Sequence, residues 1–313
     1  MLTANKIYNM EAIEFMKQID SKAVDLVLCD LPYEVTQNDW DKKLNLKSFF
    51  QESWRVLKEN GIIVLTSQQP FTTALINAEP KYFKYELIWD KIKSVGFLNS
   101  KKMPLRRHET ILVFYKKFGK YNPQMQKAIK DRIRPKLTPR KTTSKNYGKI
   151  DKVYSEENYD INMRFPNSII SVSSISKECN SLNRKHPTQK PVELFEWLVK
   201  TYSNEGDLVL DCTIGVGTTA IACKNTNRNF IGNDLNQEFV KIANQQLSQD
   251  KLNAFSNTQN STSSGFPTEN SPNISLKDNS NKLSQISSND ETSLNNNIHR
   301  LRPNLKKCSR GKL

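Results

Sequence analysis

Apolar positions follow two different periods over residues 1–117. Short apolar runs rich in strand-forming residues, typical of buried strands, occupy 6–8, 24–29, 62–66, 82–89 and 110–115. Apolar side chains at helical spacing occupy 11–18 and 45–58, and Gly61 is expected to end the second of these helices. Because strands alternate with helices, the pattern predicts an α/β fold with a mostly parallel, doubly wound sheet.

This alternation stops and then returns. Residues 118–185 carry four prolines, many charges and a serine-rich stretch, so we expect an inserted, irregular region there. Between 186 and 250 the pattern again predicts helices and strands, with helices at 191–202, 218–224 and 238–247 and strands at 208–210 and 230–232. In residues 251–313, Ser and Asn fill 24 of 63 positions, too little apolar surface to offset the entropy cost of ordering, and we predict a disordered tail.

The basic residues of the chain are concentrated in one region, which indicates a binding partner. The chain has 47 Lys and Arg against 32 Asp and Glu, a net charge of +15. Residues 101–150 alone hold 16 Lys and Arg against Glu109 and Asp131. Evenly spread lysines would indicate an ordinary solvated surface or a compositional bias, whereas this concentration favours a surface that binds nucleic acid.

The sequence gives no sign of a membrane-spanning, secreted, disulfide-rich or metal-binding protein. No run of about 18 apolar residues is present, and the first residues lack the apolar core of a signal peptide. The five cysteines form no Cys-x-x-Cys pair, so neither a disulfide framework nor a zinc ribbon is expected, and the three scattered histidines suggest no metal site. We therefore expect a cytoplasmic protein with no membrane partner and no metal.

A glycine-containing loop from Asp211 to Thr219 follows a predicted strand and opens a predicted helix. Its two glycines allow a ligand to approach the backbone, and the helix start adds N–H donors. The next strand ends in Asp234, where a carboxylate can accept hydrogen bonds from ribose hydroxyls. Asp211 would repel a phosphate but suits a cationic amino acid group, which favours S-adenosylmethionine (SAM) over NAD or ATP. A tight turn without a ligand is the alternative.

The tetrapeptide Asp30-Leu31-Pro32-Tyr33 lies where another predicted strand ends. The Asp30 carboxylate and the Leu31 carbonyl can both accept hydrogen bonds from an exocyclic amine. Pro32 stiffens the turn, and Tyr33 offers a ring on which a flipped base can stack. An ordinary turn at a strand end is again the alternative.

Together these loops, with the string from His186 to Pro191 between them, resemble the DNA methyltransferases that methylate adenine N6 or cytosine N4. The order of the parts, with the tetrapeptide before the SAM loop, is similar to their β subgroup, and the resemblance spans about residues 5–250. It implies a SAM-dependent, Rossmann-like methyltransferase fold in permuted order. The parts would be a catalytic half at 1–117, a target-recognition insertion at 118–185, a SAM-binding half at 186–250 and the tail at 251–313.

The resemblance also assigns roles to residues. Asp30, Leu31, Pro32 and Tyr33 match the catalytic tetrapeptide, and an aspartate in first place is similar to adenine-N6 enzymes. Cofactor contacts are implied for Glu11, Thr188, Lys190, Asp211, Gly215, Gly217, Thr218 and Asp234. The implied activity is direct transfer of the SAM methyl group to N6 of an adenine that is flipped out of double-stranded DNA, with no covalent intermediate. Cys29 is therefore expected to be a buried apolar residue rather than a nucleophile.

DNA, SAM and a restriction endonuclease are the implied partners, the last as part of a restriction-modification pair, and location near the nucleoid follows. Contacts to DNA are expected from the basic window and the insertion, namely Lys101, Lys102, Arg106, Arg107, Arg132, Arg134, Lys136, Arg140 and Lys141.

Three other functions stay open at this point. A cytosine-N4 enzyme would share the fold and the mechanism. A DNA-binding relative without catalysis would fit the departures from the family pattern at Glu34, Cys212 and Val216. An RNA or protein-glutamine methyltransferase has a similar tetrapeptide, but usually with Asn in first place and after the SAM loop.

Overall fold

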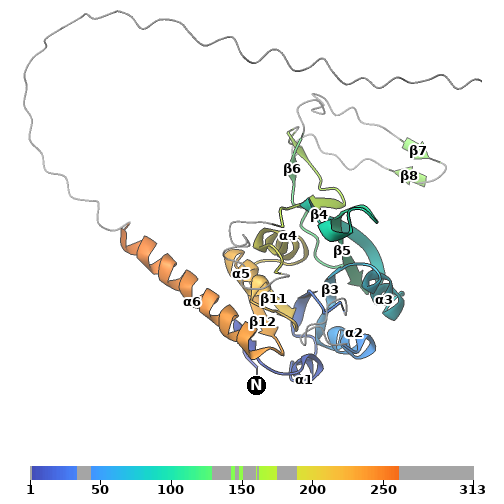
Figure 1. Ribbon diagram of the computed structural model, residues 1–313. Helices are drawn as coiled ribbons and strands as arrows, with labels where there is room; N and C mark the ends of the chain where they lie inside the picture. Colours follow the sequence, from blue (N-terminus) through green and yellow to red (C-terminus); the bar gives the residue numbers. More distant parts are fainter. Residues whose placement is uncertain are drawn as a thin grey trace, which may run out of the picture. The chain divides into compact units, whose positions relative to one another are not determined.

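A computed structural model describes residues 2–33, 44–128, 142–144, 148–150, 160, 162–174 and 189–260, with secondary structure alone for 142–144, 148–150 and 249–260 (Figure 1). Most of the predicted tail and much of the predicted insertion lie outside these residues. None of the helices in the described part is long and apolar enough to cross a membrane.

Eight of the described strands form one sheet in the order β1-β12-β11-β2-β3-β5-β4-β10. They are β1 (Lys6–Tyr8), β2 (Val24–Cys29), β3 (Leu57–Ser67), β4 (Phe83–Val95), β5 (Arg106–Tyr115), β10 (Ile169–Ser171), β11 (Leu208–Asp211) and β12 (Asn229–Asn233). Only β5 runs antiparallel to its neighbours β3 and β4. The predicted α/β fold with a mostly parallel sheet is confirmed.

Helices cover both faces of this sheet. One apolar core contains side chains of α1 (Ala12–Lys17), α2 (Leu46–Val56) and α3 (Phe71–Ala78), while a second contains those of α4 (Val192–Tyr202), α5 (Thr218–Asn225) and α6 (Gln237–Asn260). Strand β2 is buried along its whole length, and its side chains point alternately into the two cores. Leu26 and Leu28 lie in the core with α4, α5 and α6, and Val27 and Cys29 lie in the core with α1, α2 and α3. A continuous apolar run is the pattern that a strand covered on both faces requires.

Part of the region predicted as an insertion belongs to the sheet. Strand β10 pairs in parallel with β4, and Ile170 is buried there. Two small strand pairs lie elsewhere in this region: β6 (Gln126–Lys127) pairs with β9 (Met163–Arg164), and β7 (Thr142–Ser144) pairs with β8 (Gly148–Ile150).

The prediction that Gly61 ends a helix is wrong. Helix α2 ends at Val56, and Gly61 lies inside β3. A Cβ atom at Gly61 would stand 2.6 Å from Cδ2 of Leu57, so glycine serves close packing within the strand. The sequence patterns also missed α3 and gave α6 too short, since that helix continues to Asn260.

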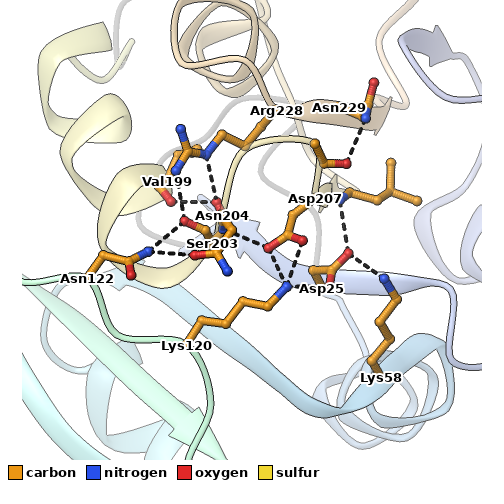
Figure 2. Close-up of polar contacts among 12 residues, drawn as sticks. Asp25, Lys58, Lys120, Asn122, Val199, Ser203, Asn204, Asp207, Arg228 and Asn229 are labelled. Atoms are coloured by element: carbon orange, nitrogen blue, oxygen red, sulfur yellow. Dashed lines mark hydrogen bonds and ion pairs between the residues drawn. The ribbon is translucent and has the colours of Figure 1, made fainter.

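At the sheet edge where β2, β3 and β11 begin, a polar network joins these strand ends to the segment after β5 (Figure 2). Lys120, just after β5, lies 2.9 Å from Asp25 and 2.5 Å from Asp207, and Lys58 lies 2.7 Å from Asp25. Burial favours the neutral Asp25, but these lysines outweigh it and lower the pKa of Asp25. Asn122 continues the network to the last turn of α4 through the carbonyl of Lys200. The chain therefore leaves β5 toward the insertion from a fixed point.

Candidate active site at the carboxyl edge of the sheet

The predicted functional loops meet at one edge of the sheet. Strands β1, β12, β11, β2 and β3 are mutually parallel, so the loops after them leave the same edge. This edge is where ligands bind in open α/β sheets. The loop after β11 and the tetrapeptide after β2 are joined directly, because the Thr213 hydroxyl donates to the Asp30 carbonyl at 3.2 Å.

The glycine loop after β11 is shaped by its own acid. Asp211 is buried, and its carboxylate accepts hydrogen bonds from the Thr213 N–H at 3.1 Å and from the Thr219 hydroxyl. Both glycines have left-handed backbone, with φ of 55° at Gly215 and 96° at Gly217. Burial raises the pKa of Asp211 to about 7, against the effect of these hydrogen bonds.

The two glycines serve different purposes. A Cβ at Gly217 would lie 2.9 Å from Cβ of Ala243, so Gly217 allows α5 to pack against α6. A Cβ at Gly215 would meet nothing within 4 Å, so the backbone of that turn faces open space. Thr218, the first residue of α5, is buried and donates through its hydroxyl to the Lys190 carbonyl at 3.4 Å.

Asp234, after β12, lies against this loop. One carboxylate oxygen accepts from the Gly215 N–H and the other from the Asn236 N–H, both at 2.8 Å. Burial raises the pKa of Asp234, partly offset by these two amides. The predicted pairing of the glycine loop with the acid at the next strand end is therefore present in the structure.

Asn233 is an edge residue that the sequence patterns missed. It is fully buried, and its side chain donates to the carbonyls of Met10 and Cys212 at 3.0 and 3.2 Å and accepts from the Met10 N–H at 3.1 Å. It thus ties the loops after β1, β11 and β12 together. The available signal was a polar residue at the end of an apolar strand. Glu11, nearby, caps α1 by accepting from the Glu14 N–H at 2.9 Å, and its contact with a cofactor stays a prediction.

The tetrapeptide holds one carboxylate in a fixed position. Oδ1 of Asp30 accepts hydrogen bonds from the Tyr33 hydroxyl at 2.8 Å and from the Thr66 hydroxyl, and Oδ2 accepts from the Lys190 ammonium at 2.7 Å. The Asp30 side chain keeps 25% of its surface exposed. A carboxylate held by three donors and still partly open can accept one more hydrogen bond from a bound substrate.

Leu31 and Tyr33 anchor this turn. Leu31 is 2% exposed and belongs to the core, which leaves its main chain for any substrate contact. The Tyr33 ring packs against Phe71 with centroids 5.5 Å apart. Burial and the neighbouring charge of Asp30 raise the pKa of Tyr33 well above its usual range, so its phenol stays neutral and donates.

A chain of alternating buried charges extends from Asp30. Lys190 lies 2.7 Å from Asp30 and 3.4 Å from Glu109, and Glu109 lies 2.5 Å from Lys91. All but Asp30 have side chains no more than 10% exposed. Burial alone would lower the pKa of Lys190, but Asp30, Tyr33 and Glu109 together raise it well above its usual range. The resemblance implies a cofactor contact for Lys190, which stays a prediction; in the structure its ammonium contacts the Asp30 carboxylate.

The two cysteines of this edge are part of the core. Cys29 and Cys212 are buried with their sulfur atoms 3.8 Å apart. Burial raises the pKa of Cys29 well above its usual range, which makes it a poor nucleophile. The expectation that Cys29 is a buried apolar residue is confirmed.

The expected DNA contacts divide into two groups. Lys101, Lys102, Arg106 and Arg107 are exposed on the hairpin that β4 and β5 form, the first two in its turn and the last two at the start of β5. Arg107 is also a bidentate partner of Asp90, at 2.7 and 2.8 Å, and holds the pKa of that carboxyl down to about 2. Thr188 and the five remaining basic residues lie outside the described residues: Arg132, Arg134, Lys136, Arg140 and Lys141.

Known proteins are similar to this chain in sequence. A family model described as DNA methylase, named for N6 and N4 methylation, matches residues 24–245. The Type II methyltransferase M1.MboII of Moraxella bovis is 32% identical over 274 residues, which cover 81% of this chain and 100% of that protein. The DNA adenine methyltransferase YhdJ of Escherichia coli (strain K12) is 26% identical and covers 78% of this chain and 83% of that protein.

One solved structure illustrates the shared fold. The cytosine-N4-specific PvuII DNA methyltransferase superimposes with a TM-score of 0.53 at 15% identity, covering 76% of this chain and 84% of that chain. At this identity the likeness concerns the fold alone.

Proposed function

The chain belongs to the amino-methylating DNA methylase family, and from this premise we propose that it transfers a methyl group from SAM to N6 of adenine in double-stranded DNA. The observation that carries the proposal is the carboxylate of Asp30, fixed by three donors at the edge where the SAM loop also lies. An aspartate in this place resembles adenine-N6 enzymes, and the relative YhdJ is named a DNA adenine methyltransferase.

The residues at the edge fit SAM. Gly215 presents backbone to open space, and Asp234 can accept hydrogen bonds from ribose hydroxyls. Asp211 supplies negative charge near the place where a cationic amino acid group would lie, although its carboxylate is buried. When bound, SAM supplies an electrophilic methyl group on a sulfonium ion.

The tetrapeptide would activate the target amine. The N6 lone pair of adenine is delocalised into the ring, so the amine is a weak nucleophile. A hydrogen bond from N6–H to Asp30 and a second to the Leu31 carbonyl would favour a tetrahedral nitrogen and stabilise the positive charge that develops on it. Holding the amine in line with the methyl group supplies the proximity effect.

Modified bases in DNA from expressing cells test this proposal. A plasmid propagated in a methylation-free host with the intact chain should carry modified adenine at one short recognition sequence, whereas the Asp30→Ala variant should leave it unmodified. Modification of cytosine would instead support the second candidate, a cytosine-N4 enzyme, which the fold of the PvuII methyltransferase keeps open. The same data would give the recognition sequence.

Further parts of the proposal concern partners and organisation. Residues 1–117 and 186–250 would form the catalytic and SAM-binding halves, and 118–185 would recognise the target with its basic residues on phosphates. Relatives named Type II methyltransferases suggest a restriction endonuclease partner. The place of action would be the cytoplasmic nucleoid, where the DNA is.

Replacing Asp234 with alanine is expected to weaken SAM binding by about 10- to 100-fold, the loss of one or two charge-assisted hydrogen bonds. Asp234 also accepts from the Gly215 N–H, so part of the loss would come from a less ordered loop. Isothermal titration calorimetry with SAM measures the effect. Glu238→Ala, which removes an exposed acid in the first turn of α6, should leave the affinity unchanged. Unaltered affinity in the Asp234 variant would refute its ribose role.

Asp211 makes a prediction about protons. Because burial raises its pKa to about 7, roughly half of the free protein carries a proton there at pH 7. A bound ammonium group would favour the ionised form, so SAM binding should release up to about half a proton at pH 7 and strengthen as pH rises through 7. Titrations in two buffers of different ionisation enthalpy count this proton.

The Asp211→Asn variant tests whether Asp211 is the source of the proton released on SAM binding. The amide keeps the hydrogen bonds of the protonated acid, so the variant should bind SAM with no proton release. In the wild type, folding raises the pKa of Asp211. The contribution of this carboxyl to the free energy of unfolding is therefore greatest below about pH 4 and is lost as pH rises to about 7. The variant should therefore unfold at higher temperature than the wild type at pH 8. Equal proton release by both would exclude Asp211 as its source.

A further inference from the structure

The hairpin between β4 and β5 projects beyond the catalytic edge. Ser67, the last residue of β3, pairs with Thr110 of β5, which pairs with Ile88 of β4. Both strands continue past this point, on the side where Asp30 follows the end of β2. The next residue of β5 is Glu109, whose carboxylate lies 3.4 Å from the Lys190 ammonium. The hairpin therefore starts at the active site and extends outward from it.

The tip of this hairpin is apolar and exposed. Phe97 is 79% exposed and Leu98 is 97% exposed. Six of the twelve exposed large apolar side chains in the described part of the chain lie between 92 and 105. Such a concentration is costly in water and indicates a surface that binds a partner.

The tip is also held in shape. Gly96, with φ of 90°, introduces a 3₁₀ turn, η1 (Phe97–Asn99), and the Asn99 N–H donates to its carbonyl at 2.9 Å. At the base, Asp90 joins the two strands by its bidentate pair with Arg107 and accepts from the Ile92 N–H at 2.9 Å. A preorganised tip loses little conformational entropy when it binds.

The charge around the tip identifies the partner. No acid occurs between Lys91 and His108, and the exposed basic residues of this stretch are Lys93, Lys101, Lys102, Arg106 and Arg107. Cations that surround an exposed apolar pair match a duplex, in which phosphates flank the faces of stacked bases. A purely apolar partner would offer no negative charge to Lys93, Lys101, Lys102 and Arg106, whereas Arg107 already pairs with Asp90.

We propose that Phe97 and Leu98 enter the DNA duplex beside the target base pair and fill the space that the flipped base leaves. Flipping costs the stacking of one base on both sides, and an apolar side chain in the gap restores part of that contact. The hairpin lies where this is possible, because its base contacts the residues that hold Asp30. This inference rests on the proposed DNA methyltransferase function and adds the means by which the base is kept out of the helix.

The double variant Phe97→Ala/Leu98→Ala tests the wedge. The substrate is a short duplex that contains the mapped recognition sequence, either fully paired or with an abasic site opposite the target base. On paired DNA the single-turnover methylation rate should fall by on the order of 10-fold or more, because the gap stays empty. On the abasic duplex the rate should fall by less than about threefold, since the target base is already unpaired.

Controls separate the possible results. Phe118→Ala removes a 72% exposed ring just after the other end of β5 and should leave both rates unchanged. The affinity of the double variant for SAM should also equal that of the wild type. Equal loss on both duplexes, no loss on either, or a dimer in sedimentation that the double variant disrupts would overturn the wedge. Absence of transfer by the wild type on any DNA would instead refute the proposed function.

Discussion

Replacing Asp30 with alanine is expected to lower the methyl-transfer rate on the order of 10³-fold while the affinity for SAM changes less than about threefold. In the proposed mechanism the carboxylate would be the charged acceptor for the target amine and would act in the transition state, when positive charge develops on nitrogen. Thr213 of the loop after β11 donates to the main-chain carbonyl of Asp30, and the substitution keeps that carbonyl.

The Asp30 variant also needs a control for folding. Loss of the carboxylate removes one of the two acids beside the buried ammonium of Lys190, so thermal unfolding must be recorded beside the rate. Asp30→Asn keeps the volume and should also be slow, because a neutral amide stabilises the developing charge poorly. Asp20→Ala, an exposed acid before β2, should retain full activity. A rate within tenfold of wild type for both Asp30 variants would refute the catalytic assignment.

Replacing Lys190 with methionine is expected to destabilise the fold by about 3–5 kcal/mol and to slow methyl transfer. The ammonium is buried between two carboxylates, 2.7 Å from Asp30 and 3.4 Å from Glu109. Without it, two acids face each other with only Lys91 to balance them, and Asp30 loses the donor that fixes Oδ2. Differential scanning calorimetry should show a lower unfolding temperature, by on the order of 10 °C.

Two further variants give the Lys190 result its meaning. Lys200→Met removes a partly exposed lysine of α4 that lies 3.9 Å from Glu196 and should cost less than about 1 kcal/mol. Lys190→Arg keeps the charge and should recover most of the stability. If the methionine variant unfolded at the wild-type temperature, the buried charge chain would not contribute to the fold, and Lys190 would have to act through substrate contacts alone.

Much of this site could be predicted because its signals are local. Asp30 and Asp211 each end a short apolar run, and parallel strands bring such ends to one edge. Gly217 and Asp234 follow from the same strand-loop-helix pattern. Local order does not reveal which side chains meet across the fold. Lys190 lies 160 positions from Asp30 in sequence, and that contact depends on packing of the whole domain.

The remaining differences have similar causes. Glu109 sits in an apolar strand whose pattern gives no sign that its carboxylate balances two lysines. Gly61 has the residue type of a helix end, but close packing inside β3 decides its place. Helix α3 is only eight residues long and buries two large apolar side chains, Phe71 and Leu75, which are too few to give a clear helical period. The hairpin tip at Phe97 and Leu98 gave no periodic signal, since its exposure arises from strands that run past the sheet edge.

The most direct test of the central claim is the identity of the methylated nucleoside. Purified protein is incubated with unmethylated duplex DNA and SAM labelled in its methyl group, and the DNA is digested to nucleosides and separated. We expect the label in N6-methyldeoxyadenosine, with none from the Asp30→Ala variant. Label in N4-methyldeoxycytidine, or no label in DNA from a protein that binds SAM, would contradict the proposed adenine-N6 activity.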